Sequence, residues 1–236
     1  MPRDVGVVVV AAGKSERLGG PVPKQFLPVA GVPLLLRALR PFLAHPAVRE
    51  VIAVLPAQAA AAPPGWLADL VGERLQVTAG GPTRTASSAL GVARLSPACG
   101  IVLVHDGARP FPSAEVIEAV IETARRGSGA IAAVPLSDTL KAAEPASAIV
   151  SRTIPRDGLW RAQTPQGFPR RLLEDANRRA EYDGWAGTDE AELIERYGGQ
   201  VVLIRDSVTN LKVTTEDDLR LAEAFARNDQ SPVPSH

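Results

Sequence analysis

The sequence predicts a single α/β domain in which a mainly parallel, twisted β-sheet is covered by helices on both faces. Apolar segments of strand length alternate with amphipathic segments of helix length along the chain, and this alternation is typical of parallel strands joined by crossover helices. The first apolar segment, Val5–Val10, lacks polar alternation, which indicates a strand buried on both faces. We expect one domain over residues 1–228 and a flexible tail over residues 229–236.

Composition excludes several classes of protein. Acidic and basic residues balance at 26 each, so no overall field would recruit nucleic acid or a membrane. A single cysteine, Cys99, excludes an intramolecular disulfide and a cysteine-rich zinc site. The apolar run Val5–Ala12 is much shorter than the about 20 residues that cross a bilayer, and no signal-peptide cleavage region follows it. We therefore expect a cytoplasmic protein.

The first half of the chain alternates strands and helices. Apolar residues at helical spacing predict a helix over Pro33–Leu43. The alanine-rich segment 57–71 is expected to be only partly helical, because Pro63, Pro64 and Gly65 interrupt it. The other predicted elements of this half are strands over residues 51–55, 75–78 and 101–104 and a helix over residues 83–95.

Helix-capping signals mark the second half. Ser113 is a predicted N-cap, and Thr215 with Asp218 forms a capping-box-like start to a helix over residues 216–225. Leu136–Pro155 fits neither a helix nor a short turn. A structureless loop of about 20 residues is unusual in a compact domain, so we expect this segment to have a function. The remaining predictions are strands over residues 130–134 and 201–204 and helices over residues 170–180 and 188–197.

The loop after the first strand has the composition of an anion site. Ala11, Ala12 and Gly13 let a ligand approach the main chain, and Arg17 and Lys24 add cations. Ligands of such sheets bind beyond the carboxyl ends of the strands. The three-glycine dinucleotide fingerprint and the P-loop both fail to fit, because their required glycines are missing.

The pattern that fits is A-A-G-x-x-x-R-L-G-x-x-x-P-K-Q, over residues 11–25. It resembles the nucleotide-binding signature of the sugar-phosphate nucleotidyltransferases, and with Phe26 it looks most like the 2-C-methyl-D-erythritol 4-phosphate cytidylyltransferase family. The resemblance extends over residues 5–216 with six motifs in order. It implies a nucleotide-diphospho-sugar transferase-like fold with a protruding arm over residues 136–155.

Two further motifs resemble the nucleotide site of that family. In Gly80-Gly81-x-x-Arg84-x-x-Ser87, the resemblance implies that Gly80, Gly81 and Ser87 line the nucleoside pocket. In the run His105–Pro110, an aspartate at a strand end beside a triphosphate is suited to Mg²⁺, so Asp106 is the predicted metal ligand. His105 is expected to be structural. Gly107 stands where the family usually has alanine, which should loosen a ribose contact.

The remaining motifs imply an acceptor site shared between two chains. The resemblance implies that the arm reaches across a homodimer, so that Thr139 and Arg109 serve the partner's active site. In the run 156–166, Arg156 offers a planar fork for a phosphate and Thr164 a hydroxyl. Lys212, in Asn210–Thr214, carries over as a phosphate-binding cation.

These residues fit one reaction. A phosphate monoester is already ionised near neutral pH, since its second pKa is about 6, so nucleotidyl transfer needs positioning and charge stabilisation and no general base. Arg17, Lys24 and Lys212 are the predicted catalytic cations. We interpret the reaction as CTP plus 2-C-methyl-D-erythritol 4-phosphate giving the CDP-linked alditol and pyrophosphate, a step of non-mevalonate isoprenoid biosynthesis.

Two alternatives remain open at this point. Ribitol 5-phosphate cytidylyltransferases share the fold and much of the motif set. A non-catalytic nucleotide sensor would keep the pocket without turnover. Arg17, Lys24 and Lys212 together argue against the sensor, because binding alone does not require all three cations.

Overall fold

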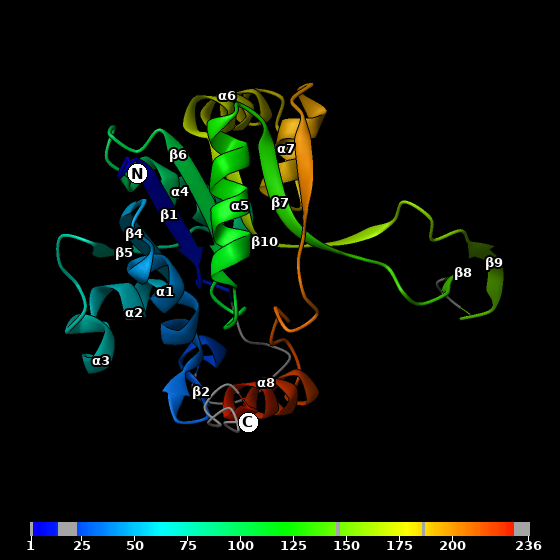
Figure 1. The fold of residues 1–236 in the computed structure, drawn as a ribbon, viewed down its shortest axis with the longest axis horizontal. Helices are drawn as coiled ribbons and strands as arrows, with labels where there is room; N and C mark the ends of the chain where they lie inside the picture. Colours follow the sequence, from blue (N-terminus) through cyan, green and yellow to red (C-terminus); the bar gives the residue numbers. More distant parts are fainter. Residues whose placement is uncertain (1, 14–22, 145–146, 186, 229–236) are drawn as a thin grey trace, which may run out of the picture.

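The computed structural model describes residues 2–13, 23–144, 147–185 and 187–228. Its centre is a seven-stranded sheet with the order β11-β7-β10-β6-β1-β4-β5 (Figure 1). Neighbouring strands are parallel except at β10, which runs antiparallel to both β6 and β7. The predicted mainly parallel sheet is therefore confirmed. The strands are β1 (Val5–Val10), β4 (Val48–Leu55), β5 (Leu75–Ala79), β6 (Ile101–Asp106), β7 (Gly129–Pro135), β10 (Trp160–Pro169) and β11 (Val201–Arg205).

Helices cover both faces of this sheet, as predicted. On one face, α1 (Leu34–Ala44) and α5 (Ala114–Arg125) bury apolar residues such as Phe42 and Ile117 against the strands. On the other face, α4 (Arg84–Arg94), α6 (Arg170–Tyr182) and α7 (Glu190–Arg196) form a second cluster around Phe168 and Leu173. The β-branched runs of β1 and β6 are buried because they lie between these two layers.

Short elements complete the domain. The segment after β4 is split into α2 (Ala57–Ala61) and α3 (Gly65–Ala68), as its prolines predicted. A small hairpin of β2 (Pro28–Val29) and β3 (Val32–Pro33) packs near α8 (Glu216–Asn228). Among the described residues, no helix has the length and apolar character to cross a membrane.

Side-chain caps fix several helix starts where the sequence places them. The Ser113 hydroxyl accepts the Val116 N–H at 3.2 Å. Thr215 Oγ1 accepts the Asp218 N–H at 3.2 Å, and Asp218 Oδ2 accepts the Thr215 N–H at 2.8 Å. The predicted N-cap and capping box are confirmed. The start of α7 differs from the prediction, because Asp189 caps this helix, which begins at Glu190 and not at Thr188.

The arm, residues 136–155, contains two strands that were not predicted. β8 (Leu140–Ala143) and β9 (Val150–Ile154) pair antiparallel with each other and with none of the other described strands. This hairpin projects far from the domain (Figure 1). The tail over residues 229–236 lies outside the described residues.

Candidate active site

A cavity of about 570 Å³ lies at the carboxyl ends of β1 and β6, and we call it the cleft. Eight residues predicted from the sequence line it: Ala11, Ala12, Gly13, Lys24, Gly81, Ser87, Asp106 and Lys212. They come from segments that are far apart in the chain, and the Lys24 ammonium donates to the Val213 carbonyl at 3.2 Å. Arg17, the other predicted catalytic cation, lies outside the described residues.

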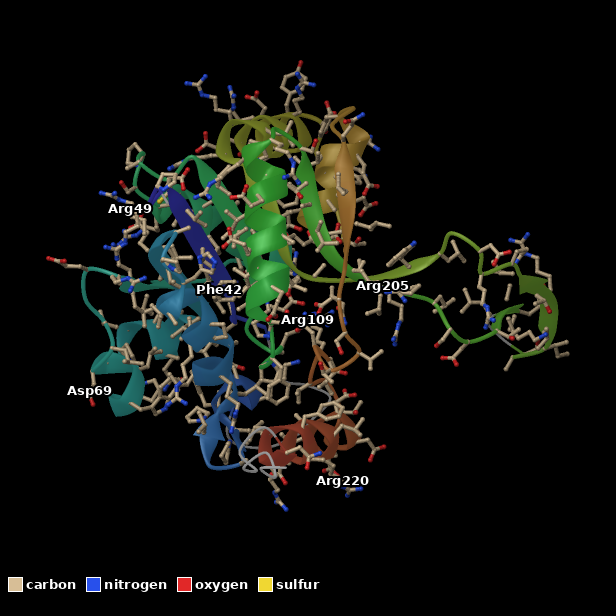
Figure 2. The ribbon with its side chains drawn as sticks, viewed as in Figure 1. Phe42, Arg49, Asp69, Arg109, Arg205 and Arg220 are labelled. Carbon is tan, nitrogen blue, oxygen red and sulfur yellow. The ribbon has the colours of Figure 1, made fainter. Side chains whose placement is uncertain are left out.

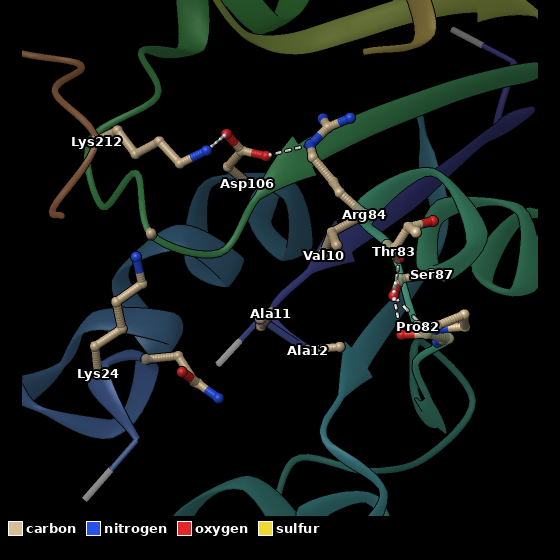
Figure 3. Close-up of a pocket in the computed structure, with 14 residues that line it drawn as sticks. Val10, Ala11, Ala12, Lys24, Pro82, Thr83, Arg84, Ser87, Asp106 and Lys212 are labelled. Atoms are coloured by element: carbon tan, nitrogen blue, oxygen red, sulfur yellow. Dashed lines mark hydrogen bonds and ion pairs between the residues drawn. The ribbon is translucent and has the colours of Figure 1, made fainter. Parts of the chain in front are cut away.

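The cleft has two walls. In Figure 3, Lys24 and Lys212 lie on one side, Pro82, Thr83 and Ser87 on the other, and Ala11 and Ala12 between them. The Ser87 hydroxyl accepts the Gly81 N–H at 3.1 Å and donates to the Thr83 carbonyl at 2.8 Å. Ser87 therefore fixes the turn that leads into α4. The wall of Pro82, Thr83 and Ser87 is formed by a hydrogen-bonded turn. The opposite wall carries the two ammonium groups of Lys24 and Lys212.

Two predicted glycines, Gly80 and Gly107, support the cleft without lining it. A Cβ at Gly80 would lie 2.3 Å from the Ala12 Cβ, and one at Gly107 would lie 2.8 Å from the Ala11 Cβ. Both glycines allow the loop after β1 to pack closely against its neighbours. At Gly107, Ala11 and Leu35 occupy the space of the missing side chain, and the looser ribose contact expected there stays a prediction.

Asp106 is the centre of charge in the cleft. Lys212 Nζ lies 2.8 Å from its Oδ2, and Arg84 Nε lies 3.0 Å from its Oδ1. Burial alone would raise the pKa of the Asp106 carboxyl, but the charges of Arg84 and Lys212 outweigh burial and hold that pKa well below its usual range. Asp106 is therefore a carboxylate at neutral pH.

His105 and Thr164 form a buried network behind Asp106. His105 Nε2 lies 3.0 Å from the Arg109 carbonyl, so this nitrogen carries the proton, and Nδ1 lies 3.0 Å from Thr164 Oγ1. The Thr164 oxygen also accepts the Asp106 N–H at 3.0 Å. Burial lowers the pKa of His105 to about 4. The structural role predicted for His105 fits this network, whereas the hydroxyl of Thr164 is already engaged and orients Asp106.

Arg109 is buried beside Asp106 of its own chain. Its guanidinium donates to the Asn210 carbonyl at 2.7 Å, and its Nε lies 3.8 Å from Asp106 Oδ2. Burial lowers the pKa of Arg109. Arg109 lines a smaller cavity of about 160 Å³ that shares Asp106 and Lys212 with the cleft. It therefore lies beside the cleft of its own chain, and the expectation that it serves the partner's active site stays a prediction.

Comparison with known proteins decides the family. The family model described as 2-C-methyl-D-erythritol 4-phosphate cytidylyltransferase matches residues 5–228. The chain belongs to this family. The family is made up of CTP-dependent nucleotidyltransferases of isoprenoid biosynthesis, so the chain is an enzyme of that class.

Individual relatives agree. The chain is 43% identical to the 2-C-methyl-D-erythritol 4-phosphate cytidylyltransferase of Xylella fastidiosa, over 91% of this chain and 94% of the relative. The crystal structure of the Thermus thermophilus enzyme of the same name superposes with a TM-score of 0.80 at 37% identity, over 95% and 99% of the two chains. The chain is also 39% identical to a bifunctional enzyme IspD/IspF of Desulfotalea psychrophila, and it spans 58% of that protein's length.

Two residues that the family resemblance placed in the acceptor site lie away from the cleft. Thr139 is exposed on the arm, and Arg156 is exposed just after it and donates a hydrogen bond to the Ser137 carbonyl. Neither lines the cleft. Figure 2 shows Arg109 near the centre of the molecule, far from the β8–β9 hairpin at the end of the arm. One cytidylyltransferase chain therefore brings together the nucleotide-side residues but not these two.

Three residues in or beside the cleft were not assigned a role from the sequence. Arg84 stands inside the quoted glycine motif, but the spacing does not say that its guanidinium turns to Asp106 and Glu190. Glu190 looked like an ordinary acidic residue at a helix start, yet it is only 1% exposed. Gln25 lines the cleft with a buried side-chain nitrogen that has no hydrogen-bond partner in the described structure. The only sequence signal for any of the three was the position of Arg84, a charged residue at a predicted helix start just after two glycines.

The predicted metal ligand is a lone carboxylate. The described residues contain no group of three or more His, Cys, Asp or Glu side chains that could hold a metal ion. Mg²⁺ is commonly held by one or two carboxylates while phosphates and waters complete its octahedron. Asp106, ionised and lining the cleft, fits a site of that kind, with the remaining ligands supplied by a nucleotide.

Proposed function

We propose that this chain transfers the cytidylyl group of CTP to 2-C-methyl-D-erythritol 4-phosphate. An oxygen of the acceptor phosphate forms a bond to the α-phosphorus, the bond from that phosphorus to the β-phosphate oxygen breaks, and pyrophosphate leaves. The observation that carries this proposal is the gathering of Lys24, Arg84 and Lys212 in one cleft, in a chain of the cytidylyltransferase family. The family match favours methylerythritol phosphate over ribitol 5-phosphate.

The two walls suit the two halves of CTP. The wall of Gly81 and Ser87 would receive the nucleoside, with the main chain before α4 facing it. The loop Ala11–Gly13 would lie along the phosphates, since small side chains expose its N–H groups. Lys24 on the opposite wall would then face the phosphorus under attack.

Catalysis in this cleft would be electrostatic. The acceptor phosphate needs no general base, and His105 could not supply one because both of its ring nitrogens are engaged. Lys24, Lys212 and Arg17 would offset the charge that develops on the α-phosphoryl oxygens. Mg²⁺ held by Asp106 and the phosphates would neutralise part of the same charge.

The arm would act in a second copy of the chain. Ile149 and Val150 near its tip are 67% and 55% exposed, and apolar exposure on a projecting hairpin is typical of a contact surface. In a homodimer, Thr139 and Arg156 could complete the partner's acceptor site, with Arg156 holding the acceptor phosphate. Both substrates are cytoplasmic metabolites, so we place the enzyme in the cytoplasm.

Substrate assignment is tested by pyrophosphate release. We expect turnover with CTP and methylerythritol phosphate, and much slower turnover with ribitol 5-phosphate, GTP or UTP. Equal rates with both acceptors, or no release at all in the presence of Mg²⁺, would refute the assignment.

Arm exchange is tested by mixing two inactive variants. Lys24→Ala carries a defect in the cleft, and Arg156→Ala carries one beside the arm. Random exchange would place one intact site in each hybrid dimer and restore about a quarter of the wild-type activity. If the arm serves its own chain, no hybrid contains an intact site, and the mixture stays as inactive as its components.

A further inference from the structure

We propose that Glu190 is a positioning residue for the transfer reaction, because it anchors Arg84 against Asp106 and so leaves Lys212 free to move onto a phosphate. The inference rests on the proposed function. It concerns two side chains from the starts of two different helices: Arg84, which lines the cleft, and Glu190, which lies buried behind it.

The anchor is a buried ion pair. Arg84 NH1 donates to both oxygens of Glu190, at 3.0 and 2.9 Å, while Arg84 Nε donates to Asp106 Oδ1 at 3.0 Å. The Glu190 side chain is 2% exposed and that of Arg84 is 25% exposed. Burial alone would lower the pKa of Arg84, but the carboxylates of Glu190 and Asp106 together raise this pKa by more than burial lowers it. Arg84 therefore stays charged. Two nitrogens of the guanidinium are therefore each fixed by a different carboxylate.

The helix starts that carry this pair are themselves fixed. Thr83 and Asp189 cap α4 and α7, and Thr85 Oγ1 donates to the Gly187 carbonyl at 3.1 Å. On the other side, Gln166 of β10 donates to Asp189 Oδ2 at 2.8 Å and accepts the Ala191 N–H at 3.2 Å. Glu190 thus occupies a rigid position from which it can fix Arg84.

Lys212 contrasts with Arg84. It lies in a segment without helix or strand, its side chain is 39% exposed, and its ammonium contacts the other oxygen of Asp106 at 2.8 Å. A lysine is a point charge on a flexible stem, whereas arginine forms a planar fork. Of the two cations that contact Asp106 within 3.0 Å, Lys212 is the one that can exchange the carboxylate for an incoming phosphate. Asp106 would then keep its charge and orientation through Arg84, with Arg109 3.8 Å from its Oδ2.

A double-mutant cycle tests this inference. We expect Glu190→Gln and Arg84→Gln each to lower kcat by about tenfold while the KM for CTP changes by less than about twofold. If Glu190 acts through Arg84, the Arg84→Gln/Glu190→Gln double variant has the same kcat as Arg84→Gln alone. Glu195→Gln, the same substitution at an exposed site of α7, is the matched control and should retain wild-type kcat.

Stability is measured separately, because breaking a buried ion pair also weakens the fold. Thermal melting of all variants sets an assay temperature at which each is folded. We expect the double variant, whose buried pair is neutral, to melt higher than either single variant while its kcat stays low. Multiplicative defects in kcat, or a Glu190→Gln variant that melts lower but turns over at the wild-type rate, would overturn the positioning role.

These outcomes are distinct from failure of the proposed function. If wild-type protein does not release pyrophosphate from CTP and methylerythritol phosphate, the proposed function falls. If the wild-type enzyme is active but the kcat defects of the two single variants multiply in the double variant, only the role of Glu190 is refuted.

Discussion

The cleft and the arm are built on opposite principles. Residues in and behind the cleft, such as Asp106, Thr164 and Glu190, are less than 8% exposed and are fixed by hydrogen bonds from several elements. On the arm, Thr139 is exposed, and β8 and β9 pair only with each other among the described strands. The described lining of the cleft comes from one chain, whereas the hairpin of the arm pairs with no further strand in the part of the chain that the structure describes.

This difference separates two tasks of a transferase. Stabilising the charge of a transition state requires groups that are already held in place, since moving them during the reaction would reduce their electrostatic effect. The buried hydrogen-bond network beside the cleft holds Asp106 and Arg84 in this way. Recognition of a second substrate can be completed by a neighbouring chain, and the projecting hairpin is suited to that task. Substitutions in the two regions should therefore fail in different ways.

The largest effect is expected in the cleft. Lys24→Ala removes an ammonium from the wall that faces the phosphates, and we expect kcat to fall by about 10²- to 10³-fold because that charge acts on the transition state. Steady-state pyrophosphate release measures it, and Arg171→Ala, on the exposed side of α6, is the control for loss of a cation. An unchanged kcat with a raised KM for CTP would mean that Lys24 only binds the nucleotide.

A smaller effect is expected when the hairpin is removed. Replacing residues 140–154 with a short Gly-Ser linker deletes β8 and β9 as a unit but keeps Thr139 and Arg156. We expect the melting temperature of the domain to change little, the proposed dimer to be lost in analytical ultracentrifugation, and kcat/KM for the acceptor to fall at least about tenfold because the acceptor loses its alignment. A fully active monomer would show that the arm is dispensable.

Sequence and structure agree best where one physical signal dominates. β1 and α1 were predicted closely, because a run that is β-branched apart from Gly6 and an amphipathic stripe each fit one kind of element. β10 was missed because Gln163, Thr164 and Pro165 interrupt its apolar pattern at the register shift between Ala162 and Gln166. Gln163 and Thr164 line the smaller cavity beside Asp106. Polar residues required at the site therefore stand where a buried strand would otherwise have apolar ones, and the strand pattern is lost.

The same reasoning explains the site. Residues within a motif, such as Ala11–Gly13, could be predicted because their role depends on local main-chain shape. Arg84 and Glu190 could not, since their pairing joins residues 106 positions apart and depends on how two helix starts meet. The position of the Arg109 side chain was also not predictable, because nothing in its own motif indicates that it turns toward Asp106 of the same chain.

Acid should distinguish the buried network from the arm. The pKa of His105 is about 4 in the folded chain against 6.5 for an ordinary imidazole, so between these values the unfolded chain binds more protons. The stability from neutral His105 is present above pH 6.5 and is lost as pH falls toward 4. Between pH 7 and pH 5, we expect wild type to lose about 2 kcal/mol more of its unfolding free energy than His105→Gln. Urea unfolding at both pH values measures this difference, and parallel losses would contradict it.

The smallest effect is expected at Gly107. An added Cβ would lie 2.8 Å from the Ala11 Cβ and 3.1 Å from Leu35 Cδ1, and contacts this short force a neighbour to move. Because Ala11 lines the cleft, we expect Gly107→Ala to raise the KM for CTP by a few-fold with little change in kcat, whereas Gly158→Ala beside the arm should leave that KM unchanged. Gly158 has a positive φ of 78°, so its substitution strains the backbone without touching the nucleotide site. A Gly107→Ala variant with lower KM would show that alanine restores a ribose contact, and that the loop after β1 yields to make room for it.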